Sequence, residues 1–124
     1  MTATRVVPGT ASPAWRSLLE ARWRERLGTL TELSLAYHDA AAAGRSPGRR
    51  TPGGTSDTAE LNRLMREATV ARRALRDTEE ALARLSAGGY GRCEQCGASI
   101  PAVTLRLEPE ARYCRVCVEA ATAA

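Results

Sequence analysis

The sequence predicts a mainly α-helical protein, in which a long antiparallel coiled-coil hairpin precedes a small four-cysteine finger and a short C-terminal helix. Two observations support this prediction. Large apolar residues recur every three or four positions in two long stretches without proline, and the four cysteines form two Cys-x2-Cys pairs near the C-terminus. The 124-residue chain has two Trp, three Tyr and no Phe, so it cannot bury a large apolar core. It therefore needs an additional cross-link, which the four cysteines can provide.

The first long helix is expected to begin at Pro13 and to end before Gly44. Proline suits the first helical position, Ser12 suits the N-cap, and glycine commonly ends a helix. The polar residues 1–12 are expected to form a disordered N-terminal lead. The apolar stripe of this helix consists of Leu19, Trp23, Leu30, Leu33, Tyr37 and Ala40.

A second long helix is expected over residues 57–87, after a loop of residues 44–56 that is rich in Gly, Pro and Arg. Asp57 followed by Glu60 is a variant of the capping box that begins a helix. The apolar stripe repeats with the roughly 3.5-residue period of a coiled-coil seam. It consists of Leu61, Leu64, Ala68, Ala71, Leu75, Thr78, Leu82 and Leu85.

Two seams joined by a loop favour an antiparallel hairpin over residues 13–87, with residues 44–56 at its tip. Pairing around the loop predicts three contacts of a large side chain with a small one: Trp23 with Thr78, Leu30 with Ala71, and Leu33 with Ala68. The alternative pairs the same stripes between molecules in an intermolecular bundle. We expect a monomer, and gel filtration at several concentrations separates the two arrangements.

The cysteines follow the pattern Cys93-x2-Cys96, then seventeen residues, then Cys114-x2-Cys117. This spacing is typical of a tetrahedral zinc site, to which each short pair supplies two thiolates. Four thiolates leave no coordination position open, so the pattern predicts one structural Zn²⁺ and not a catalytic ion. Residues 88–124 are therefore expected to form a C4 zinc finger with a C-terminal helix.

Two other uses of the cysteines stay open, namely two disulfides or free thiols, and a redox switch in which oxidation releases zinc. The N-terminus has no apolar stretch typical of a secretory signal, and the longest apolar run, residues 40–43, is far too short to span a membrane. A cytoplasmic location is therefore expected, where disulfides rarely persist.

The net charge of +4 is unevenly distributed, and every basic residue is an arginine. The excess lies in residues 1–55, whereas residues 56–87 and 88–124 each contain equal numbers of arginines and acids. No helix is therefore expected to present a dense basic face, and we expect no direct sequence-specific DNA binding. An enzyme is not expected either, because no nucleophile, base and open metal position come together.

After the helical hairpin, the order of the finger residues becomes specific. The segment Gly89-Tyr90-Gly91-Arg92-Cys93-Glu94-Gln95-Cys96-Gly97, followed by Ile100, Pro109, Cys114 and Cys117, resembles the DksA/TraR zinc-finger family. The resemblance implies a regulator that binds bacterial RNA polymerase, often together with the alarmone ppGpp, and cleaves nothing. It further implies that the coiled coil enters the secondary channel, with acidic tip residues near the catalytic metal.

The tip departs from the pattern of this family. In the family signature Asp-x-x-Asp-x-Ala, Asp57 and Ala59 match, but Gly54 stands at the first acidic position. The basic pair expected before Leu105 is also replaced, by Val103 and Thr104. Asp57 has two interpretations, a carboxylate that approaches the polymerase metal or a plain helix cap.

Three arginines, Arg45, Arg49 and Arg50, make the field of the tip loop positive. A positive tip is attracted to phosphates or to an acidic protein surface, unless the loop is simply solvated. The main hypothesis is a DksA/TraR-like regulator that binds RNA polymerase through the secondary channel. The alternative is a zinc-finger adaptor that binds another protein or a nucleic acid through this arginine-rich loop.

Overall fold

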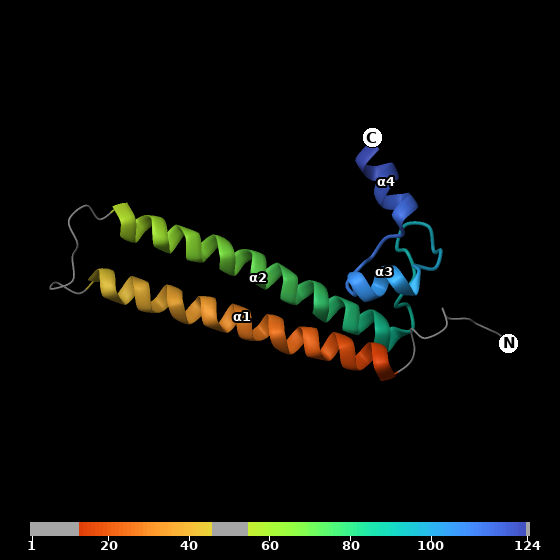
Figure 1. Cartoon of the computed structure of the whole chain (residues 1–124), viewed down its shortest axis with the longest axis horizontal. Helices are drawn as coiled ribbons and strands as arrows, with labels where there is room; N and C mark the ends of the chain where they lie inside the picture. Colours follow the sequence, from red (N-terminus) through yellow and green to blue (C-terminus); the bar gives the residue numbers. More distant parts are fainter. Residues whose placement is uncertain (1–12, 46–54, 124) are drawn as a thin grey trace. The chain divides into compact units, whose positions relative to one another are not determined.

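The computed structural model describes residues 13–45 and 55–123 and confirms the mainly helical fold (Figure 1). Its elements are α1 (Pro13–Arg45), α2 (Thr55–Ala87), α3 (Ala102–Leu107) and α4 (Arg115–Ala123). The two long helices form the predicted hairpin, and α4 is the predicted short C-terminal helix. In the described part of the chain, no helix is long and apolar enough to cross a membrane.

Both long helices extend further toward the tip of the hairpin than the sequence predicts. α1 continues through Gly44 to Arg45, and α2 begins at Thr55, so Asp57 is a helical residue and not the N-cap. Glycine in a helix costs only about 1 kcal/mol relative to alanine, and Gly44 follows four alanines, the residue with the highest helix propensity. The predicted tip loop of residues 44–56 therefore includes helix at both ends.

The described residues divide into two compact units. One contains residues 13–23 and 77–123, which are the two helix ends near the finger and the finger itself. The other contains residues 24–76, which are the remaining parts of α1 and α2.

In the unit of residues 24–76, α1 and α2 pack through the predicted stripes. Leu64, Ala71 and Leu75 are buried, and the stripe residues of α1 in this unit are half-buried. The Arg26 guanidinium donates to the Ala74 carbonyl oxygen at 2.9 Å. This contact agrees to within one residue with the predicted antiparallel register.

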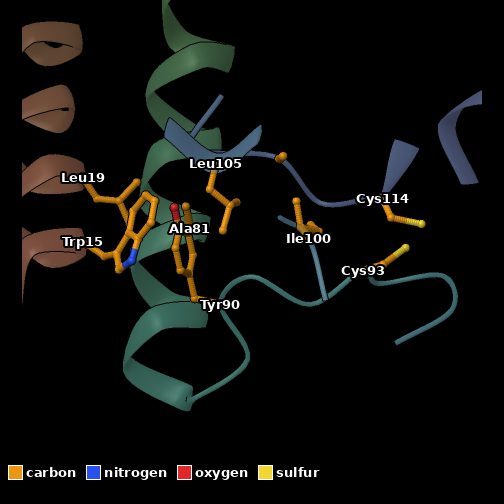
Figure 2. Close-up of a cluster of buried hydrophobic side chains, with 9 residues drawn as sticks. Trp15, Leu19, Ala81, Tyr90, Cys93, Ile100, Leu105 and Cys114 are labelled. Atoms are coloured by element: carbon orange, nitrogen blue, oxygen red, sulfur yellow. The ribbon is translucent and has the colours of Figure 1, made fainter. Parts of the chain in front are cut away.

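In the unit of residues 13–23 and 77–123, the ends of both long helices and the finger share one apolar core. Figure 2 shows Trp15 and Leu19 of α1 on one side, Ala81 of α2 between, and the finger residues beyond. The rings of Trp15 and Tyr90 lie with centroids 5.7 Å apart at an interplanar angle of 53°. The core consists of Trp15, Leu19, Ala81, Tyr90, Cys93, Ile100, Leu105, Ala111 and Cys114.

Candidate metal centre

The first pair of cysteines lies on a tight turn that the backbone closes upon itself. The Cys93 amide donates to the Ala98 carbonyl at 2.8 Å, and the Gly97 amide donates to the Cys93 carbonyl at 2.9 Å. Gly91 and Gly97 have φ angles of 85° and 78°, in the left-handed region that favours glycine. The structure thus confirms that glycines allow the chain to turn tightly around the first two sulfurs.

The second pair lies where α4 begins. Cys114 directly precedes this helix and Cys117 lies in its first turn, and the Val118 amide donates to the Cys114 carbonyl at 3.0 Å. Because Cys114 and Cys117 are three residues apart at the start of a helix, both side chains point toward the first pair of cysteines. Figure 2 shows the sulfurs of Cys93 and Cys114 facing each other.

The four sulfurs form one cluster that fits a tetrahedral metal ion. All four Sγ atoms lie within 4.8 Å of one another, and those of Cys96 and Cys114 are 3.7 Å apart. Four sulfurs at the usual Zn–S distance of about 2.3 Å lie roughly 3.8 Å from one another. All four cysteines of the chain are described and none forms a disulfide. The predicted disulfide alternative is therefore absent from this structure.

The local environment prepares the cluster to bind a cation. Burial raises the pKa of the Cys93 thiol, but the backbone N–H groups of Cys114, Cys96 and Gln95 outweigh this effect, and the pKa falls to about 6. Hydrogen bonds with the sulfurs of Cys114 and Cys93 instead hold a proton on Cys117 and raise its pKa to about 12. Thiols that share protons in this way exchange them for a divalent ion that binds thiolates.

Charged side chains hold the first pair of cysteines against α2. Glu94 lies 3.6 Å from Arg84 of α2 and 3.6 Å from Arg112. Its backbone N–H donates to the Arg112 carbonyl at 2.8 Å, and Arg112 also pairs with Glu80 of α2. The sequence does not predict these contacts, because it does not show which distant residue a charged side chain meets in the folded chain.

A buried carboxylate connects three segments of the unit. Glu110 accepts hydrogen bonds from Arg22 of α1 at 2.8 and 2.9 Å and from the Thr78 hydroxyl of α2 at 2.8 Å. The Glu110 side chain is only 7% exposed. The Tyr90 hydroxyl donates to the Pro109 carbonyl at 2.9 Å beside it. Thr78 is the one polar residue of the predicted α2 seam, and this irregularity was the only signal in the sequence that a polar partner lies opposite.

The predicted tip residues are not brought together within the described part of the chain. Ala59 lies exposed on α2. Asp57 and Arg45 belong to α2 and α1, but their side chains lie outside the described residues, as do Arg49 and Arg50 altogether. The tip site therefore stays a prediction.

Comparisons with known proteins agree with this geometry. Residues 88–123 match the family model described as "Prokaryotic dksA/traR C4-type zinc finger". An uncharacterized protein of Aquifex aeolicus (strain VF5) is 44% identical over 45 residues, which cover 36% of this chain but only 31% of that protein.

A solved structure resembles nearly the whole chain. The structure of transcription factor DksA2 from Pseudomonas aeruginosa superposes with a TM-score of 0.82 at 23% sequence identity, covering 93% of this chain and 85% of that one. Residues 88–123 therefore form a DksA/TraR-type C4 zinc finger, and the hairpin and finger together have the fold of DksA2. The resemblance predicted from the sequence is confirmed, and the four clustered cysteines of this C4 finger fit the one zinc ion predicted as its cofactor.

Proposed function

We propose that this protein is a transcription regulator that binds bacterial RNA polymerase. The observation that carries the proposal is the joining of a DksA/TraR-type C4 finger to a long helical hairpin in the arrangement of a known transcription factor, DksA2. The proposal includes a cytoplasmic location, where its partner works, and the absence of an enzymatic activity of its own.

The chemistry of the finger supports a binding role. The cluster holds four sulfurs, which complete the coordination of one zinc ion and leave no position for a substrate or a reactive water. The residues that hold the zinc are Cys93, Cys96, Cys114 and Cys117, and bound zinc supplies fold stability to the finger. The finger thereby anchors one end of the hairpin and leaves the other end to contact the partner.

The hairpin supports insertion into the polymerase. α1 and α2 each contain 33 residues, a length of about 50 Å at ~1.5 Å per residue. We propose that the tip, with Asp57 and Ala59, enters the secondary channel, and that Arg45, Arg49 and Arg50 contact phosphates or acidic groups there. The alarmone ppGpp is a proposed partner of the same complex.

Photo-crosslinking to purified core polymerase tests this proposal. A photoreactive residue at Ala59, near the tip, is compared with one at Ala120, exposed on α4. We expect the Ala59 position to crosslink to polymerase subunits at the secondary channel and the Ala120 position to crosslink elsewhere. Absence of any polymerase binding in a pull-down of the zinc-loaded protein would refute the function. Binding with crosslinks from Ala59 outside the channel would refute the insertion alone.

The role of Asp57 has its own test. Asp57→Asn removes one carboxylate at the tip, and Glu119→Gln removes one exposed carboxylate on α4 as a control with the same charge change. If Asp57 acts near the polymerase metal, Asp57→Asn alters transcription in vitro while polymerase binding persists, and Glu119→Gln alters neither. Unchanged transcription with Asp57→Asn would show that the helical hairpin acts only by occupying space in the polymerase.

A further inference from the structure

The unit of residues 24–76 has a hollow of about 200 Å³ to which both long helices contribute. At ~30 Å³ for each molecule of liquid water, this volume corresponds to roughly seven waters, so the hollow suits a small ligand. Its polar and aromatic lining consists of Ser34, Tyr37 and His38 of α1, and of Met65, Thr69 and Arg72 of α2. No carboxylate lines it.

Arg72 brings to this hollow a positive charge that no acid neutralises. In the part of the chain that the structure describes, its side chain is exposed and forms no ion pair. Its surface neighbours on α2, three and four residues away, are Ala68, Thr69, Leu75 and Arg76. None of these is acidic, and Arg76 adds a second positive charge. The Arg72 guanidinium is therefore available to an anion.

The acids nearest in sequence lie away from the hollow. Glu32 and Asp39 of α1 and Asp77 of α2 each come two residues after a residue of the predicted seam. Two residues correspond to about 200° around a helix, which turns these acids to the side away from the other helix. Glu60 and Glu67 are bound by Arg63 at 2.7 and 2.6 Å. The hollow therefore has a positive field.

Ser34 provides a hydroxyl that is available to a ligand. Thr69 donates to the Met65 carbonyl at 2.9 Å, and Thr29 and Thr31 of α1 likewise donate to carbonyls four residues earlier. Ser34 forms no such hydrogen bond within residues 13–45 and 55–123. Its O–H group and the N–H groups of Arg72 thus offer two kinds of donor to one anion.

The opposite end of the hollow suits a planar apolar group. Because α1 and α2 run in opposite directions, Ser34 and Arg72 lie at one end of the lining, and His38 and Met65 lie at the other. The rings of Tyr37 and His38 are nearly perpendicular, with centroids 6.0 Å apart and an interplanar angle of 86°. Met65 is 52% exposed, and its flexible thioether packs well against aromatic rings.

We propose that this hollow binds a small phosphate monoester that carries a planar ring. The phosphate lies between the Arg72 guanidinium and the Ser34 hydroxyl, and the ring lies against Tyr37 and Met65. A phosphate suits the first end because it carries up to two negative charges and three acceptor oxygens, and a guanidinium binds it through two N–H groups. A planar ring suits the second end because it can stack on an aromatic side chain. The proposal does not depend on polymerase binding.

An NMR titration of the full-length, zinc-loaded protein with phenyl phosphate tests the proposal. Because the hollow is small and open to solvent, we expect a dissociation constant of about 1–10 mM at low salt. The amide signals of residues 34–38 and 65–72 should shift most. Inorganic phosphate and phenol, each of which provides one half of the probe, should bind about fivefold more weakly or less. Shifts spread over all arginine-containing segments, or equal binding of inorganic phosphate, would overturn the proposal.

A matched pair of variants separates this site from general attraction of anions. Arg72→Gln should weaken binding of phenyl phosphate by about fivefold or more. Arg73→Gln removes the same charge from the next residue, which is exposed and does not line the hollow, and should change binding by less than about twofold. Equal effects of the two substitutions in folded proteins would contradict the site.

Two biological sources supply this ligand chemistry, a nucleotide and a phosphorylated tyrosine. Titrations with adenosine monophosphate and with phosphotyrosine amide distinguish them. We expect one of the two to bind more tightly than phenyl phosphate and to lose affinity with Arg72→Gln but not with Arg73→Gln. Weaker binding of both than of phenyl phosphate would overturn the assignment of the hollow to a biological phosphate ester.

Discussion

The Arg22 guanidinium and the Glu110 carboxylate form a two-pronged ion pair, with Nε–Oε2 at 2.8 Å and Nη2–Oε1 at 2.9 Å. Arg22 lies on α1 and Glu110 lies in the finger, 88 residues further along the chain. The Thr78 hydroxyl of α2 donates to the same carboxylate, so one buried acid joins both long helices to the finger. Bidentate pairs of this kind fix orientation as well as contributing energy.

Replacement of Glu110 should therefore destabilise the unit of residues 13–23 and 77–123. Glu110→Ala leaves the Thr78 hydroxyl and the half-buried Arg22 guanidinium without their carboxylate, and we expect a loss of about 2–4 kcal/mol. Urea unfolding followed by circular dichroism measures it. Glu119→Ala, on the exposed surface of α4, should change stability by less than about 0.5 kcal/mol. Equal effects of the two substitutions would contradict the role of Glu110.

A second prediction compares two leucines of α3 that are two residues apart. Leu105 is fully buried, whereas Leu107 is 84% exposed. Leu105→Ala removes apolar atoms from the core and leaves a cavity, at an expected cost of about 2–4 kcal/mol. Leu107→Ala should cost less than about 0.5 kcal/mol. Thermal unfolding of the zinc-loaded variants distinguishes them, and a small effect of Leu105→Ala would mean that α3 does not pack as described.

A third prediction concerns stability at high pH. Burial, and then the negative charge of Glu110, raise the pKa of Tyr90 to about 12 from its ordinary value of 10.0. The folded protein therefore favours the neutral phenol more strongly than the unfolded chain does. This contribution is fully present below about pH 10 and is lost as the pH rises toward 12.

Tyr90→Phe isolates this effect. The variant loses the hydrogen bond to the Pro109 carbonyl, which costs about 1 kcal/mol near neutral pH. The difference in unfolding free energy between wild type and variant should shrink above about pH 10. An ultraviolet titration of phenolate should show one high-pKa tyrosine in the wild type and lose it in the variant. A constant difference up to pH 12 would contradict the prediction.

A fourth prediction concerns the metal. Structural zinc sites contribute about 10–16 kcal/mol of apparent binding free energy near neutral pH. Cys96→Ser should therefore abolish stoichiometric zinc in elemental analysis and remove amide protection from residues 88–117. Ser99→Ala, on the same turn and exposed, should retain both. A strong chelator should reproduce the effect of Cys96→Ser in the wild type, and persistence of the folded finger without zinc would refute a structural role.

The sequence by itself determined the elements whose signals are local. The seam spacing from Leu61 to Leu85 predicts α2 because apolar residues that recur about every 3.5 positions lie on one face of an α-helix in a coiled coil. The two Cys-x2-Cys pairs predict the zinc site because the spacing within each pair already sets the distance between its sulfurs. The sequence predicted the helix ends less accurately. The first helix was expected to end before Gly44, but α1 continues to Arg45, since a glycine ends a helix only when nothing else favours its continuation.

The tertiary structure decided what depends on which distant residues meet. It places Glu110 against Arg22 and Thr78, and it pairs Arg112 of the finger with Glu80 of α2. Counting charges along the chain hides both facts, because a charge acts over a few ångströms in space and not along the sequence. Glu80 and Arg84 of α2 therefore have their partners in the finger, and this pairing arises only when the helix folds against it.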